Sequence, residues 1–320
     1  VDARFKKPLC RGVSAKVINA AILGGDLYPS SAIGINLPNS NWVRAEHGSK
    51  SVTIANLTHA YDEAARGNGF RNEFADNAQT VSMMDRYGSV CDDLHTDLHE
   101  CLGHGSGRLL PGVDPDALKA YGSTIEEARA DLFGLYYLAD EKLVELGLTP
   151  CQEAYKAQYY SYMMNGLLTQ MVRIQPGHQI EEAHMRNRAL IARWTLEHYP
   201  QAVRLSEQDG KHYVEILDYP LLRTAFSTLL AEIQRIKSEG DLQAARQMVE
   251  RYGVQIDATL HQEVLERYSK LNLAPYKGFI NPRYTPIYDQ EGHITDVHID
   301  YLETYDEQML RYSKQYNTLI

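Results

Sequence analysis

Two histidines five residues apart, with a glutamate directly after the first, place the strongest constraint on how this chain folds. They lie in the segment HECLGH, residues 99–104. In a regular α-helix a spacing of five rotates the second side chain by about 140°, whereas the spacing of four in the zinc peptidase motif HExxH rotates it by about 40°. We therefore interpret HECLGH as HExxH with one inserted residue. The insertion predicts a local π-type turn, which Gly103 is best able to permit.

A second acidic motif, EEARAD at residues 126–131, begins 22 residues after His104. Catalytic zinc sites use three protein ligands, and two histidines plus one glutamate is an established set. We expect His99, His104 and Glu127 to bind the metal. Glu126 and Asp131 are the candidate acceptors for the second ring N–H of each histidine. Without a metal, the two motifs would be solvated histidines and an acidic first helical turn.

Together, HECLGH and EEARAD resemble the motifs HExxGH and EExxAD of the dipeptidyl peptidase III family of zinc exopeptidases. The segments GINLPN (34–39), HGSGRL (104–109) and EEAHMRNR (181–188) strengthen the resemblance. It implies one Zn²⁺ per chain and oligopeptide substrates from which dipeptides are released at the N-terminus. It also implies that residues 1–320 form the catalytic zinc-binding domain of a larger two-lobed peptidase. The N-terminal lobe would be missing here, so low activity of this part alone is expected.

The roles of the remaining site residues follow from the motif and from the resemblance. In HExxH enzymes the glutamate takes the proton of the attacking water and passes it to the leaving amine, which is the role expected of Glu100. The resemblance implies that His184 stabilises charge on the reacting carbonyl oxygen and that Arg188 binds the peptide. It also implies that Asn36 and Asn39 hold the N-terminal end of the peptide.

Two alternatives stay open at this point. Another zinc aminopeptidase or endopeptidase would use the same chemistry and differ only in its products. A zinc-stabilised, non-catalytic interaction scaffold belongs to a different class of protein. The presence of Glu100 argues against the scaffold, because a purely structural zinc site needs ligands but no base.

Charge and hydropathy exclude several classes of partner. The chain has 32 Lys and Arg against 42 Asp and Glu, a formal net charge of −10, and no basic block that would favour nucleic acid or an anionic membrane. No apolar run is long enough to span a bilayer. The four cysteines have no CxxC spacing, which predicts free thiols and a cytoplasmic location; they are Cys10, Cys91, Cys101 and Cys151.

The periodicity predicts a mainly α fold of the α+β class with small β-hairpins. A short strand is expected at residues 33–37, and hairpins around Asp209-Gly210 and Gly292. Besides the two metal-site helices, the predicted helices span residues 13–23, 51–66, 70–87, 149–174, 179–198, 220–238, 241–252, 257–271 and 303–316.

Overall fold

The protein is mainly helical, as predicted, with three small sheets among the described residues. The computed structural model describes residues 2–7, 14–24, 28, 32–37, 43, 46–48, 50–274 and 279–317, with the backbone alone at 14, 15 and 36. The elements, in chain order, are η1 (Ala3–Phe5), β1 (Ser14–Ile18), β2 (Gly34–Leu37), β3 (Lys50–Ile54), α2 (Ala55–Ala65), α3 (Phe70–Phe74), α4 (Ala78–Leu98), the π-helix η3 (His99–His104), η4 (Lys119–Tyr121), α5 (Gly122–Leu138), α6 (Glu141–Glu145), α7 (Tyr155–Leu167), η5 (Thr169–Arg173), α8 (Ala183–His198), β4 (Val203–Gln208), β5 (Lys211–Ile216), α9 (Tyr219–Glu239), α10 (Leu242–Val249), the π-helix η6 (Glu250–Val254), α11 (Ala258–Lys270), β6 (Arg283–Tyr288), β7 (Ile294–Asp300) and α12 (Tyr305–Tyr316).

The chain divides into two compact units. The first comprises residues 1–16, 34–53 and 65–274, and the second residues 17–33, 54–64 and 275–320. The single domain expected over residues 1–320 is thus resolved into two units. That both units belong to one catalytic domain stays a prediction.

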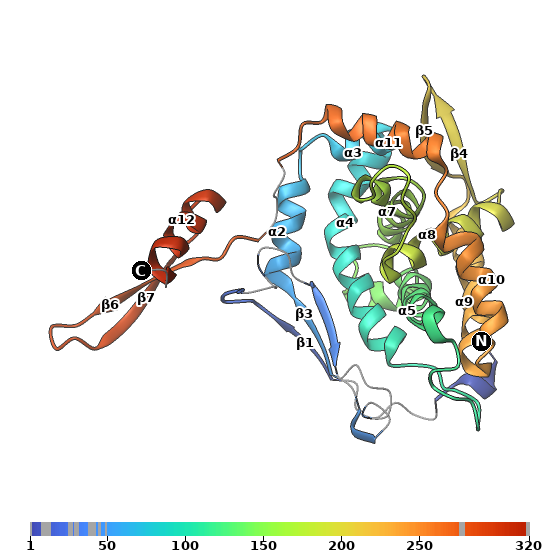
Figure 1. Ribbon diagram of the computed structural model, residues 1–320, viewed down its shortest axis with the longest axis horizontal. Helices are drawn as coiled ribbons and strands as arrows, with labels where there is room; N and C mark the ends of the chain where they lie inside the picture. Colours follow the sequence, from blue (N-terminus) through green and yellow to red (C-terminus); the bar gives the residue numbers. More distant parts are fainter. Residues whose placement is uncertain are drawn as a thin grey trace. The chain divides into compact units, whose positions relative to one another are not determined.

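Helix α5 forms the centre of the first unit. It contacts α4, α8 and α9, while α7 contacts α4 and α8 (Figure 1). Consecutive residues of α5, from Ala128 to Leu132, are all buried, as is typical of a helix with protein on every side. Full burial of an aliphatic side chain such as Leu132 or Ile125 contributes about 1.5–3 kcal/mol. This packed core holds the acidic motif of α5 against the end of α4.

The structure contradicts one predicted helix, shortens another, and divides others, among them 241–252, which consists of α10 and the π-helix η6. The predicted helix 13–23 is wrong: Ser14–Ile18 form strand β1, which suits the β-branched pair Val17 and Ile18. The predicted helix 51–66 begins only after strand β3, again in a β-branched segment. Helix 70–87 is interrupted before Asn77, whose side chain accepts a hydrogen bond from the N–H of Thr80 and caps α4. Helix 149–174 consists of α7 and the 3-10 turn η5.

Both predicted hairpins are present. β4 pairs with β5 across Asp209-Gly210, and β6 pairs with β7 around Gly292, which has a φ of 85°. In the second unit, buried Asn281 joins two chain segments: its side chain accepts a hydrogen bond from the N–H of Leu23 (2.8 Å) and donates one to the carbonyl of Leu23 (2.9 Å).

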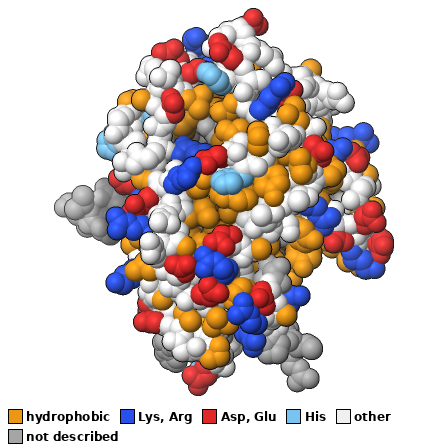
Figure 2. Space-filling model, turned by 90° about the vertical axis from the view of Figure 1, so that its right-hand side faces the viewer, with side chains coloured by type: hydrophobic (Ala, Val, Ile, Leu, Met, Phe, Trp, Pro, Cys, Tyr) orange, Lys and Arg blue, Asp and Glu red, His pale blue; other side chains and the backbone are white. Residues whose placement is uncertain are grey.

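Acidic and basic side chains are interspersed over the face shown in Figure 2 rather than gathered by sign. Among the described residues, no helix combines the length and apolar character needed to cross a membrane. Cys91, Cys101 and Cys151 are free thiols, as predicted, and Cys10 lies outside the described residues.

Candidate metal centre

Helix α4 continues directly into the π-helix, so the inserted residue lies within the histidine motif itself. The six residues His99–His104 adopt the π form, which confirms the turn predicted from the spacing. Gly103 does not have the positive φ that favours glycine. Its role is steric, because a Cβ at Gly103 would lie 2.6 Å from the Cα of Ala130 in α5. The glycine therefore lets the π turn pack directly on the helix that carries the acidic motif.

The π turn brings both imidazoles together beside a carboxylate of α5. The ring centroids of His99 and His104 are 4.7 Å apart, and each ring offers a nitrogen to a cluster with Glu100 whose ligand atoms lie within 4.8 Å of one another. Oε2 of Glu127 lies 3.3 Å from Nε2 of His99 and 3.8 Å from Nε2 of His104. The two histidines therefore face two carboxylates, those of Glu100 and Glu127.

Glu127 has the geometry of the third ligand. Atoms bound tetrahedrally at about 2.0–2.1 Å from a metal ion lie about 3.3 Å from one another, in agreement with the distance between Glu127 and His99. Oε2 of Glu127 is buried and accepts no hydrogen bond from the described residues, an arrangement that costs free energy unless a cation compensates it. Burial raises the pKa of Glu127, but the imidazoles, chiefly that of His99, outweigh burial and lower it. The residues fit a divalent metal ion.

Asp131 fixes the orientation of His99. Nδ1 of His99 donates a hydrogen bond of 2.6 Å to Oδ1 of Asp131, which directs Nε2 toward Glu127. The hydroxyl of Tyr162 (2.7 Å) and the amide of Asn187 (3.0 Å) donate to Oδ2 of Asp131. Burial raises the pKa of Asp131, but the charge of His99 outweighs it and lowers this pKa strongly. Burial lowers the pKa of His99, yet Asp131 and then Glu127 raise it to about 10.

Glu126 fixes the orientation of His104. Nδ1 of His104 donates to Oε1 of Glu126 at 2.8 Å, and the guanidinium of Arg129 donates to both oxygens of the same carboxylate at 2.7 and 3.0 Å. Lys237 of α9 donates to Oε2. Burial raises the pKa of Glu126, but Arg129 and Lys237 hold it well below its usual value. Glu126 is therefore an ionised carboxylate that is paired with two cations, Arg129 and Lys237.

Glu100 lies beside strand β2. A Cβ added to Gly34 of β2 would lie 3.2 Å from Oε1 of Glu100, so the glycine allows the strand to approach the carboxylate. β2 is at the edge of its sheet and pairs with β3 alone among the described strands. The backbone of Asn36 belongs to this edge strand, although its side chain is not described. Asn39 lies outside the described residues.

Helix α8 brings a further histidine to the cluster. Nε2 of His184 lies 3.4 Å from Oε2 of Glu127, and its Nδ1 donates to Glu182 at 2.7 Å. Glu182 also caps α8 through the backbone N–H groups of His184 and Met185. Arg188 lies one turn further along, where its charge contributes to the low pKa of Asp131.

Sequence reasoning missed four residues that hold the two supporting carboxylates: Tyr162, Asn187, Arg129 and Lys237. Arg129 carried a signal, because it lies within EEARAD at an i, i+3 spacing from Glu126. Lys237 lies 111 residues from Glu126 in the chain, so no local spacing indicates that the two residues are in contact. His95 was also missed; it lies one turn before His99, and its Nε2 contacts the carbonyl of Asp131 at 3.2 Å.

The two histidines and two carboxylates of this cluster define a candidate metal site within a mainly helical fold. Comparison with known proteins then identifies the family: the chain belongs to Peptidase family M49, whose model matches residues 28–120 and 115–270. Dipeptidyl peptidase 3 of Rattus norvegicus is 26% identical over 282 residues, covering 73% of this chain and 38% of the rat protein. This chain thus spans well under half of that relative.

Solved structures show the same fold. The structure of DPP III from Caldithrix abyssi aligns with a TM-score of 0.64 at 24% identity, over 82% of this chain and 48% of the other. Dipeptidyl-peptidase III from Corallococcus sp. strain EGB aligns with a TM-score of 0.62 at 26% identity, over 81% and 45% of the two chains. The fold predicted from the sequence is thereby confirmed.

Proposed function

We propose that this chain carries the zinc-binding catalytic centre of an exopeptidase that releases dipeptides from the N-terminus of oligopeptides. The observation that carries the proposal is the position of Oε2 of Glu127, which three imidazole nitrogens surround at 3.3 to 3.8 Å. Two histidines and one carboxylate form a ligand set that favours Zn²⁺. Membership of Peptidase family M49 and similarity to the rat enzyme support the reaction.

His99, His104 and Glu127 would hold one zinc ion, with Asp131 and Glu126 fixing the two rings. When bound, zinc polarises the scissile carbonyl and lowers the pKa of water. Glu100 takes a proton from the attacking water and passes it to the leaving amine. His184 donates a hydrogen bond to the carbonyl oxygen as negative charge develops on it.

Among the described strands β2 pairs with β3 alone, so its other edge is proposed to give the peptide a main-chain partner. An extended peptide can add to such an edge through backbone hydrogen bonds, with little demand on its side chains. Because Gly34 in this strand lies beside Glu100, a peptide bound there would pass the proposed base. Asn36, Asn39 and Arg188 are proposed to hold its ends. The rest of a relative such as the rat protein would supply further groups for substrate and for closure of the cleft.

The test combines metal analysis with mass spectrometry of the products from a defined oligopeptide. One zinc ion per chain and stepwise loss of dipeptides are expected. Single residues or internal fragments would instead identify an aminopeptidase or an endopeptidase. Stoichiometric zinc with no cleavage, even in a protein that contains the complete length of the relatives, would favour the scaffold.

A further inference from the structure

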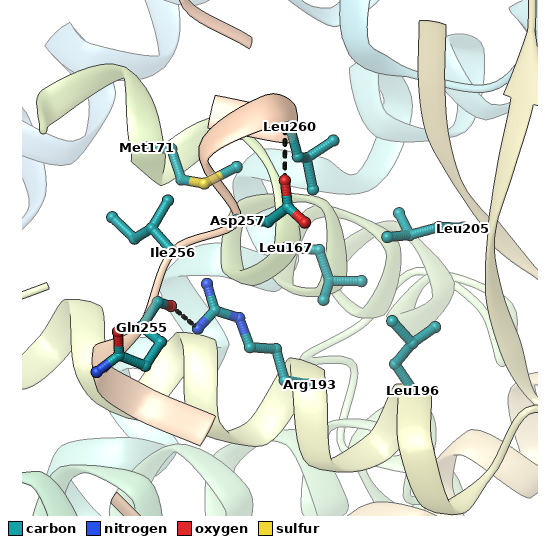
Figure 3. Close-up of a pocket in the computed structure, with 9 residues that line it drawn as sticks. All are labelled: Leu167, Met171, Arg193, Leu196, Leu205, Gln255, Ile256, Asp257 and Leu260. Atoms are coloured by element: carbon teal, nitrogen blue, oxygen red, sulfur yellow. Dashed lines mark hydrogen bonds between the residues drawn. The ribbon is translucent and has the colours of Figure 1, made fainter. Parts of the chain in front are cut away.

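A pocket in the first unit lies outside the candidate metal centre. It has a volume of about 370 Å³ and is bounded by α7, η5, α8, β4 and the segment leading into α11 (Figure 3). Six of its nine lining residues are apolar: Leu167, Met171, Leu196, Leu205, Ile256 and Leu260. This volume lies in the range of sites for small ligands, which are mostly apolar with a few polar groups.

Arg193 supplies the cation of this pocket. Its Nη1 donates to the carbonyls of Gln255 and Tyr252, while Nε and Nη2 donate no hydrogen bond to any described residue. The other terminal nitrogen points away from Gln255, toward the lining side chains (Figure 3). The structure therefore presents guanidinium donors to an apolar space.

The charge of Arg193 is poorly compensated. It forms no ion pair within 4.0 Å with the described residues, and the carboxylate in the pocket, Asp257, uses Oδ1 to accept the backbone N–H of Leu260 at 2.9 Å. Burial lowers the pKa of Arg193, and Asp257 offsets this only in part. A partly desolvated cation without a close counter-ion favours an anionic ligand, and guanidinium groups match the planar geometry of carboxylates.

We propose that this pocket binds a small monocarboxylate with an apolar tail, with the carboxylate on Arg193 and the tail against Leu196, Leu260 and their apolar neighbours. The site is separate from the metal centre, although α8 carries residues of both. Arg193 follows His184 by nine residues, about two and a half helical turns, so the two side chains leave the helix on opposite sides.

Octanoate is the probe, and isothermal titration of this chain is the measurement. We expect one octanoate to bind per chain. Octanol, which has the same tail without the charge, should bind about tenfold more weakly or worse. Binding of acetate, which lacks the tail, should be undetectable. This ligand series needs no variant. Equal affinity for octanol, or absence of octanoate binding, would overturn the proposal.

Three variants locate the bound molecule. Asp257→Asn keeps a capping side chain and removes the opposing charge, so octanoate should bind several-fold more tightly. Arg193→Met should weaken binding at least about tenfold, and Leu260→Trp should abolish it by filling the pocket. Octanoate binding that persists in Leu260→Trp would place the ligand elsewhere, for example at the metal, and contradict the proposed site.

Discussion

Gly103 and Ala130 hold the π turn against α5 at a distance that leaves no space for a side chain on the glycine. A Cβ at Gly103 would lie 2.6 Å from Cα and 2.7 Å from Cβ of Ala130. Cα and Cβ of Ala130 cannot move independently of the backbone of α5. The contact with an added Cβ would therefore be relieved only if the π turn and α5 separated. Helix separation would move His104 away from Glu127.

Gly103→Ala is therefore expected to weaken the metal centre. Overpacking of this kind costs about 1–3 kcal/mol in folding stability, and zinc affinity should fall because the ligands come from both helices. Titration with a competing chelator measures the affinity. Gly88→Ala is the matched control in α4, since its Cβ would meet nothing closer than 3.9 Å, and alanine favours a helix by up to about 1 kcal/mol. Equal zinc affinity of both variants would refute the steric role of Gly103.

The two carboxylates that face the histidines should behave differently when replaced. Glu127→Ala should lose zinc because it removes a ligand. Glu100→Ala should retain zinc and lose turnover by about 10²–10⁴-fold, the usual contribution of a general base. Metal content and peptide hydrolysis are measured on the same samples. An empty site in Glu100→Ala, or intact turnover, would reverse the assignment of ligand and base.

Lys237 is expected to tune the metal through Glu126 and His104, because it donates to the Glu126 carboxylate. Lys237→Met removes one of the two cations on the Glu126 carboxylate. Loss of such a supporting interaction typically lowers metal affinity by 10–100-fold. Lys142→Met, at an exposed ion pair on α6, serves as control and should leave affinity unchanged. If both variants bind zinc equally, the contact from α9 has no influence on the site.

A second ion-pair cluster, formed by Glu73, Lys211 and Arg267, predicts a pH-dependent stability. Arg267 is buried and donates to Oε1 of Glu73 at 2.9 Å, and Lys211 donates to the same carboxylate. Burial raises the pKa of Glu73, but Lys211 and Arg267 outweigh it and lower the pKa below 4.5. A carboxyl group whose pKa is lower in the folded than in the unfolded state stabilises the fold at pH values above its unfolded-state pKa. This stabilisation is lost as the pH falls through the folded-state pKa.

Glu73→Gln should therefore destabilise the protein near neutral pH, and the difference from the unsubstituted protein should shrink below pH 4.5. Urea unfolding at a series of pH values measures it, with an expected loss of about 1–3 kcal/mol at neutral pH. Exposed Glu145→Gln, which removes the partner of Lys142, should have little effect at any pH. A pH-independent loss in Glu73→Gln would show that packing, not charge, is responsible.

The catalytic rate of this chain alone provides a fifth test. On a dipeptidyl-arylamide substrate at equal zinc occupancy, we expect this chain to be orders of magnitude slower than the rat relative, of which it spans 38%. Groups that complete a cleft and exclude water contribute strongly to the rate. Comparable specific activities would mean that the chain contains the complete working site.

Most residues of the candidate metal centre were predicted from local sequence patterns. A spacing of five between His99 and His104 is compatible with one ion only through a π turn, so local helix geometry predicted that turn. Glu127 was predicted from ligand chemistry, because a zinc site requires a third donor and EEARAD follows His104 closely in the chain. Most helices also followed from local periodicity, although β1 did not, since apolar spacing does not distinguish a short strand from a helix.

Packing between distant segments decides which groups hold the candidate ligands in place. Tyr162, Asn187 and Lys237 reach Asp131 and Glu126 from three other helices, and no local pattern marks a residue whose partner lies far away in the chain. The steric reason for Gly103 depends on Ala130 of another helix, and the pocket around Arg193 is assembled from five separate segments. Local sequence determines backbone geometry and ligand chemistry, whereas packing between distant segments determines which polar groups are buried together.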